Sequence, residues 1–308
     1  MGDLLALLSA CSFAGANVTI TRGTGVKGQD NGAFLSILVT TVIAGAIWID
    51  GGLRHGWAPL QMAGLLWFAA AGVLTIFVGR VFLYASVQHV GAIRASAIKR
   101  LTPLFSVLLG VLVLREPFDS SMAIGMLLIF SSFAVLVRQS LVAGAAAGQA
   151  AEPQAASSWA VRLVARGFFY GPISAFAYAA GYVARKQGLN AMPDPAFGAM
   201  LGSAVGAVVF VVAARFIASY RLAVRNAFTT FNPWLFAAGV LSSMGQILYF
   251  GALTYSTISR VALISSAEVF VTMLLSVAVF RSREQLSAAV MLAAGLGTAG
   301  TVFIIFHL

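Results

Sequence analysis

Long uninterrupted apolar segments constrain this chain more than any other feature of its sequence. Ten such segments, each bounded by charged residues, Gly or Pro, occupy residues 3–21, 32–49, 60–85, 91–114, 119–138, 166–184, 196–218, 233–254, 257–280 and 286–306. A helix needs about 20 apolar residues to cross the hydrocarbon core of a bilayer, whereas membrane β-strands alternate over about ten. The segments therefore predict an all-α integral membrane protein with ten transmembrane helices.

The composition excludes a water-soluble globular domain. Of the 308 residues, 60% are hydrophobic and 9% are charged, whereas soluble proteins average roughly 25% charged residues. The net charge of +10 comes from basic residues scattered singly between the apolar segments. Residues in that pattern orient helices and contact lipid headgroups, so we expect membrane lipids and no nucleic acid as partners. The single Cys11 excludes a disulfide within the chain.

One segment divides the chain into two halves. Residues 139–165 are small, comparatively polar and low in complexity, and we interpret them as a linker between 1–138 and 166–308. Each half holds five apolar segments, and an odd number makes the second half enter the membrane from the opposite side. A shift of 166 residues also superimposes 79–115 on 245–281 with several identities. We therefore expect two inverted five-helix repeats around a central cavity.

The loop charges predict an orientation. Ten basic residues follow odd-numbered apolar segments, and five follow even-numbered ones, namely Arg54, Arg115, Arg185, Lys186 and Arg260. Because loops on the cytoplasmic side carry an excess of Lys and Arg, this count places both termini outside the cytoplasm.

Charged residues inside the predicted helices are the main candidates for a binding site: Arg80, Lys99, Arg100 and Glu268. A charge near the bilayer centre costs about 2.5 to 3.5 kcal/mol, so each should face protein or a wet cavity. Arg80 lies near the end of its segment, where it could also extend to the membrane interface. Glu268 shares one helix face with Ser265 and Thr272, which are three and four residues away.

Two interpretations of these charges remain open. In the first, Lys99 or Arg100 binds a carboxylate, and Glu268 binds an amino group or carries a coupling proton. In the second, Glu268 forms a permanent structural ion pair with one of the two bases, and no ligand is contacted.

Further polar residues at helical spacing extend the candidate site. Tyr178 lies within 166–184, and Gln246 and Tyr249 lie within 233–254, where they could line a substrate pathway. Asn17 lies within 3–21, where a buried amide serves either as a ligand contact or as a hydrogen-bonding bridge between helices.

Motifs for ATP binding, metal binding and nucleophilic catalysis are absent from the sequence. It contains no Walker A motif, no paired His/Glu zinc motif and no Gly-x-Ser-x-Gly or Gly-x-Gly-x-x-Gly element. We therefore expect no enzyme activity, no cofactor and no metal ion.

Several motifs of the first half carry a family resemblance. They are the turn Tyr84–Gly91, Leu101-Thr102-Pro103-Leu104-Phe105, Leu114-Arg115-Glu116-Pro117-Phe118 and Gly125. With the layout of ten apolar segments, this series resembles the EamA-type members of the drug/metabolite transporter superfamily, among which the YddG-like amino-acid exporters are most similar in length. The resemblance implies ATP-independent export of amino acids and related small metabolites across the bacterial inner membrane by alternating access. It also implies cytoplasmic termini, contrary to the charge count.

The leading hypothesis is a facilitative amino-acid exporter that acts as a monomer. Opposite charges from Glu268 and from Lys99 or Arg100 would suit a zwitterion, in a cavity near the third, fourth, eighth and ninth segments. One alternative is a proton-coupled antiporter of cationic drugs, with Glu268 as the proton carrier. Another is a membrane scaffold without transport activity.

Overall fold

The computed structural model describes residues 1–23, 32–79, 82, 101–146, 169–280 and 288–306, and among these residues all regular structure is helical. The helices are α1 (Gly2–Gly23), α2 (Ala33–His55), α3 (Met62–Gly72), the π-helix η1 (Val73–Gly79), α6 (Thr102–Leu114), α7 (Ser120–Ala146), α9 (Tyr170–Ala191), α10 (Pro195–Ala214), α11 (Ala218–Thr229), α12 (Pro233–Tyr255), α13 (Ile258–Ser265), α14 (Glu268–Phe280) and α15 (Ala288–Phe306). The all-α class predicted from the apolar segments is confirmed.

Five stretches of helix are long and apolar enough to cross a membrane: Gly2–Ile20, Ala33–His55, Met62–Gly79, Pro195–Ala214 and Pro233–Tyr255. Shorter apolar helices occupy Thr102–Leu114, Ser120–Val135 and Met291–Phe306. Large apolar side chains also point outward, as Leu112, Leu127 and Leu274 do with 65% to 69% of their surface exposed. Such a surface is costly in water and suits hydrocarbon, so the chain is a multi-pass membrane protein.

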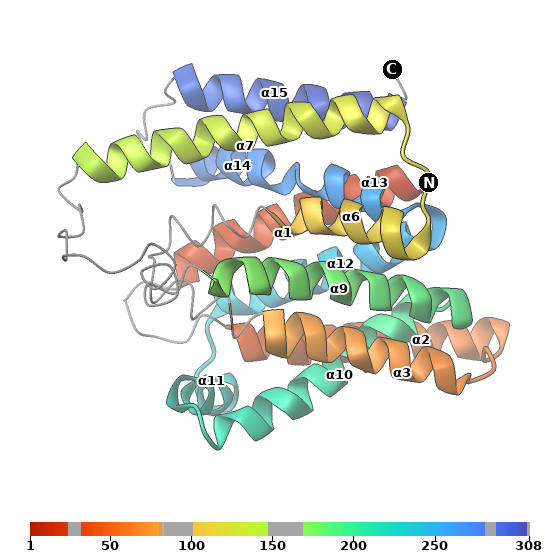
Figure 1. Ribbon diagram of the computed structural model, residues 1–308. Helices are drawn as coiled ribbons and strands as arrows, with labels where there is room; N and C mark the ends of the chain where they lie inside the picture. Colours follow the sequence, from red (N-terminus) through yellow and green to blue (C-terminus); the bar gives the residue numbers. More distant parts are fainter. Residues whose placement is uncertain (24–31, 80–81, 83–100, 147–168, 281–287, 307–308) are drawn as a thin grey trace, which may run out of the picture.

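Most of the helices run side by side across Figure 1, whereas α10 is tilted and α11 is seen nearly end-on. α7 packs along α15 at one side of the bundle, and α2, α3 and α10 form the other side. Between these layers, α1 lies against α12, and α9 lies against α3 and η1. α6 packs on α9 and α13, and α1 also contacts α13 and α14. The buried core is thus shared by helices from both halves of the chain.

Small residues let α3 and α10 approach each other closely, as the glycines and alanines of these segments predict. A Cβ on Gly72 would clash with the backbone carbonyl oxygen of Gly202. In a membrane, where lipid is as apolar as Leu, such close backbone packing supplies much of the attraction between helices. Gly72 therefore sets the distance between these two helices.

Some helix boundaries differ from those predicted. α7 continues to Ala146, into the expected linker, because the Ala-rich end of this segment favours helix. α9 continues past residue 184 to Ala191, so Arg185 and Lys186 lie inside a helix and not in a loop. Lys186 is held there because its ammonium group donates hydrogen bonds to the carbonyl oxygens of Leu253 and Ser256 at the end of α12.

Two other differences concern the second half. The predicted helix at 257–280 is divided into α13 and α14 by a short turn. The predicted loop between 218 and 233 contains α11, an amphipathic helix. Tyr220 of α11 is buried and stacks on Phe210 of α10, with ring centroids 4.2 Å apart. This contact anchors a helix that the search for apolar segments could not detect.

Arg260, assigned to a loop by the sequence, lies in the first turn of α13 and joins three helices. Its guanidinium donates to both carboxylate oxygens of Asp3, each at 2.7 Å, and to the carbonyl oxygen of Ile305 at 2.9 Å. Because the pair is mostly buried, Asp3→Asn should lower the free energy of unfolding by about 2 kcal/mol. Thermal unfolding of the purified protein in detergent measures this loss.

The exposed pair between Asp50 and Arg54 supplies the control for this prediction. Its side chains are 61% and 69% exposed, and exposed ion pairs contribute little to stability. Asp50→Asn should leave the unfolding temperature unchanged. Equal losses in the two variants would contradict a structural role for the contact between Asp3 and Arg260.

Candidate functional site

Glu268 and Asn17, both predicted from intramembrane polarity, lie together. The side-chain amide of Asn17 on α1 donates a hydrogen bond of 2.7 Å to the carboxylate of Glu268 on α14. Among the described residues, Glu268 forms no ion pair. Its negative charge is therefore solvated here by a neutral amide, which leaves carboxylate oxygen capacity for a cationic group or a proton.

The turn between α13 and α14 positions Glu268 as the first residue of a helix. The N–H of Ser266 still bonds to the carbonyl oxygens of Ala262 and Leu263, and the N–H of Phe270 bonds to Ala267. These short-range bonds close the turn between the two helices and place Glu268 at the start of α14. Broken helices of this kind form ligand and ion sites in transporters.

Ser265 and Thr272 flank Glu268 as their spacing predicts. Both hydroxyl oxygens are buried, and neither has a hydrogen-bond partner among the described residues. Buried hydroxyls are nearly always satisfied by protein or water. Together with Asn17 and Glu268 they make up the helix-break cluster.

Arg185 is a functional candidate that the sequence analysis missed. It lies on α9 with 5% of its surface exposed, facing η1 and α12. The guanidinium lies over the rings of Phe250 and Tyr182, at 4.7 and 5.3 Å from their centroids. Its side-chain hydrogen bond to Thr75 of η1 is long at 3.4 Å. The predicted helix ends at residue 184, one residue before Arg185, so the sequence places Arg185 in a loop; a helix continuing from Tyr182 places it inside the membrane.

The predicted tyrosines lie around this arginine. Tyr249 of α12 is buried, and its ring centroid is 4.8 Å from that of Tyr182. Tyr178, one turn before Tyr182 on α9, is half-buried and close enough to Arg185 for electrostatic interaction. Gln246 is half-buried on α12, one turn before Tyr249. We call Arg185, Thr75, Tyr182, Tyr249 and Phe250 the guanidinium cluster.

Three predicted site residues, Arg80, Lys99 and Arg100, lie outside the described residues. The ion pair expected between Glu268 and Lys99 or Arg100 therefore stays a prediction.

Glu116 links the two halves close to these clusters. Arg115, with a φ of 54°, ends α6 in the left-handed conformation. The Glu116 carboxylate accepts hydrogen bonds from the N–H groups of Ile258 and Ser259 at 2.6 and 3.0 Å, and from the Ser259 hydroxyl at 2.7 Å. A carboxylate at a helix N-terminus is stabilised by the exposed N–H groups and the helix dipole. This acid, one of the residues that carry the family resemblance, thus caps α13.

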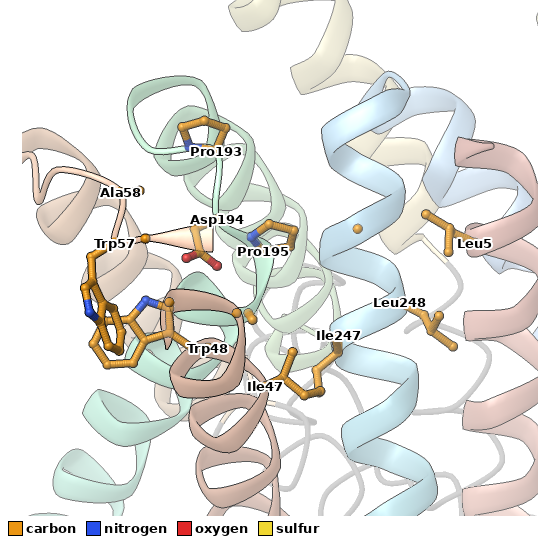
Figure 2. Close-up of a pocket in the computed structure, with 15 residues that line it drawn as sticks. Leu5, Ile47, Trp48, Trp57, Ala58, Pro193, Asp194, Pro195, Ile247 and Leu248 are labelled. Atoms are coloured by element: carbon orange, nitrogen blue, oxygen red, sulfur yellow. The ribbon is translucent and has the colours of Figure 1, made fainter. Parts of the chain in front are cut away.

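A cavity of about 460 Å³ opens between α1, α2, α12 and the connection from α9 to α10. Figure 2 shows Trp48 and Trp57 on one side of it, Asp194 and two prolines near its rim, and Leu5, Ile247 and Leu248 on the opposite wall. The lining is mainly apolar, and none of the predicted site residues that the structure describes is part of it. The cavity therefore lies apart from both polar clusters, at a position that intramembrane polarity did not indicate.

Comparisons with known proteins agree with this architecture. The model of the EamA-like transporter family matches residues 1–138 and 165–306. A crystal structure of another protein superimposes with a TM-score of 0.65, covers 99% of this chain and 97% of that chain, and is 18% identical in sequence. At that identity the likeness concerns the fold alone. No curated protein matches the chain.

Proposed function

The chain belongs to the EamA-like transporter family of the drug/metabolite transporter superfamily, and on that premise we propose that it exports amino acids and related small metabolites across the bacterial inner membrane. Transport is facilitative and proceeds by alternating access, with both termini in the cytoplasm. The binding site includes the helix-break cluster, where Glu268 receives the ammonium group of the substrate.

The observation that carries this proposal is the environment of Glu268. Glu268 is a half-buried residue of a membrane protein, at a helix break, and the described partner of its carboxylate is the neutral amide of the exposed Asn17. An intramembrane carboxylate is expensive and is kept where it binds a substrate, an ion or a proton. The unpartnered hydroxyls of Ser265 and Thr272 add hydrogen-bonding capacity beside it.

Alternating access requires two halves that can move against each other, and we propose residues 1–138 and 166–308 as inverted repeats joined by the 139–165 linker. Support comes from the helix packing. α1 lies against α12 as α9 lies against α3, while α2 packs on α10, α6 on α13, and α7 on α15. If each helix is replaced by the helix at the same position in the other half, the same set of pairs results. This symmetry is expected for related repeats.

Reconstituted protein tests the proposal. Liposomes that contain the purified protein are loaded with a mixture of labelled amino acids. They should release these amino acids faster than equally loaded liposomes without protein. Glu268→Gln keeps the size and hydrogen-bonding capacity of the side chain but removes the charge that binds the ammonium group. Initial efflux should fall roughly tenfold, because a charged contact is lost, while the protein remains monodisperse.

Asp50→Asn is the matched control, since Asp50 is an exposed carboxylate at the end of α2. This variant should transport at the wild-type rate. Normal efflux by Glu268→Gln would overturn the role of Glu268, and the absence of efflux of every amino acid by the wild-type protein would overturn the exporter function.

The charge of Glu268 also favours a second function, the proton-coupled antiport of cationic drugs. A carboxylate whose described partner is neutral can exchange a proton for an organic cation. This function requires uptake of lipophilic cations that depends on an imposed pH gradient, whereas facilitative export continues without one. The same liposomes, assayed with and without the gradient, separate the two functions.

A further inference from the structure

Arg185 is a buried charge without a counter-ion among the described residues. It is 5% exposed, and no described carboxylate lies within ion-pair distance of its guanidinium. Glu116, which is close enough to Tyr249 for electrostatic interaction, is already engaged by the N-terminus of α13. Burying an unpaired ion costs several kcal/mol, so an arginine in this place calls for a partner that the chain does not supply.

Aromatic rings cover the faces of the Arg185 guanidinium, but the N–H donors at its edge have no short hydrogen bond among the described residues. The rings of Phe250 and Tyr182 lie at cation–π distance from the guanidinium. The five N–H donors, however, point outward in the plane of the group. The contact of Nη2 with Thr75 is long at 3.4 Å, and Nε is buried with no hydrogen-bond partner in the part of the chain that the structure describes. The arginine therefore presents unused donors in the bundle interior.

Tyr249 provides a second unsatisfied group at the same place. It is 4% exposed, and its hydroxyl is buried with no hydrogen-bond partner from any described residue. The hydroxyl is close enough to Arg185 for electrostatic interaction, and the Tyr249 ring packs on Tyr182. Buried tyrosine hydroxyls usually find a partner. Two orphan donors from α9 and α12 thus converge in one buried region.

The helix that supplies Thr75 is itself unusual. η1 is a π-helix of seven residues, Val73–Gly79, that continues α3 toward α9. π-Helical turns are rare and occur frequently at functional sites, because the extra residue re-aims side chains. Here the irregular backbone stands beside Arg185, independently of the two unsatisfied donors.

We propose that Arg185 and Tyr249 form the carboxylate-binding subsite of this transporter. The inference rests on the proposed function and names the chemical class of its substrate, a small molecule that bears a carboxylate. The planar guanidinium binds the two carboxylate oxygens side by side, and the tyrosine hydroxyl donates to one of them. A carboxylate fits better than a phosphate, because one arginine balances a single negative charge. With both residues buried, the subsite is closed to solvent in this conformation, as an occluded carrier requires.

Ligand-dependent thermal unfolding of the purified protein in detergent tests the proposal separately from transport. L-Phenylalanine should raise the unfolding temperature once its concentration exceeds its Kd, by an amount that grows with the logarithm of their ratio. L-Phenylalaninamide, which keeps the ammonium group and the ring but lacks the carboxylate, should bind at least tenfold more weakly. Inorganic phosphate serves as a second anion, and tighter binding of phosphate than of L-phenylalanine would overturn the carboxylate assignment.

Variants distinguish a binding role from a structural one. Arg185→Met should bind L-phenylalanine at least tenfold more weakly but unfold at the same or a higher temperature without ligand, because an unpaired buried charge has been removed. Tyr249→Phe should bind severalfold more weakly, and it decides the question if the arginine variant does not fold. Arg54→Met, which changes an exposed arginine, should behave as wild type.

The proposal fails if the acid and the amide bind equally, if neither stabilises the protein, or if the binding of L-phenylalanine survives both substitutions in the cluster. Carboxylate binding without efflux would overturn the exporter function and leave the subsite standing. Efflux of amino acids together with equal binding of the acid and the amide would support the exporter function and overturn the carboxylate subsite.

Discussion

Gly72→Ala is expected to prevent stable folding of the protein. The added methyl group would clash with the backbone of Gly202, and backbone atoms cannot move aside by changing rotamer. α3 and α10 would have to separate, so the free energy of unfolding should fall by about 3 kcal/mol or more. That loss corresponds to a factor of about 100 in the ratio of folded to unfolded protein. The yield of monodisperse protein after detergent extraction, followed by its unfolding temperature, measures the effect.

Gly295→Ala is the matched control for this substitution. Gly295 also lies within an apolar helix, but a Cβ there would meet no atom within 4 Å. Alanine should be neutral or slightly stabilising, because it favours helix over glycine. Comparable losses at both positions would show that the close contact between α3 and α10 is not what stabilises the bundle.

Glu116→Ala is expected to destabilise the protein by about 3 kcal/mol, because it leaves buried donors without an acceptor. Ile258 and Ser259 are both fully buried, and their N–H groups donate to the Glu116 carboxylate. Loss of the cap should also loosen α13, which leads directly to Glu268. Thermal unfolding measures the first effect, and hydrogen exchange of the α13 amides, compared with wild type, measures the second.

Asp119→Ala provides the control, since Asp119 caps α7 through a 2.7 Å bond from the N–H of Met122 but is exposed. An exposed N-cap contributes about 1 kcal/mol. Glu116→Gln, which keeps an acceptor oxygen, should fall between the two alanine variants. A loss at Glu116 no larger than that at Asp119 would contradict the role of Glu116 as a buried link between the halves.

Intramembrane polarity located part of the candidate site because a bilayer tolerates few polar groups. Asn17 and Glu268 could each be selected from the sequence, yet the hydrogen bond between them joins residues 251 positions apart. Their pairing depends on how α1 packs against α14, which no local pattern encodes. The apolar cavity lined by Trp48 and Trp57 could not be found in this way, because its lining residues resemble any other membrane-facing segment.

Arg185 was not predicted as a site residue for a different reason, which is the position of a helix end. A charge at the edge of an apolar segment looks the same whether the helix ends there or continues, and segment length alone placed it in a loop. α9 continues because Lys186 binds the end of α12 and Arg185 is covered by Phe250 and Tyr182. Tertiary hydrogen bonds thus offset the cost of keeping Lys186 inside the bundle, whereas the rings cover the Arg185 guanidinium without supplying a counter-ion.

The sequence by itself determined that this chain is an all-helical membrane protein, since long apolar segments have one low-energy solution in a bilayer. Its motifs and layout also indicated the EamA family, which the family match covers over both halves. The tertiary structure decided which polar groups meet, where α13 and α14 divide, and which charge is left without a partner. The reason is physical: hydropathy is a property of single residues and their near neighbours, whereas hydrogen bonds and counter-ions are supplied by helices distant in the chain.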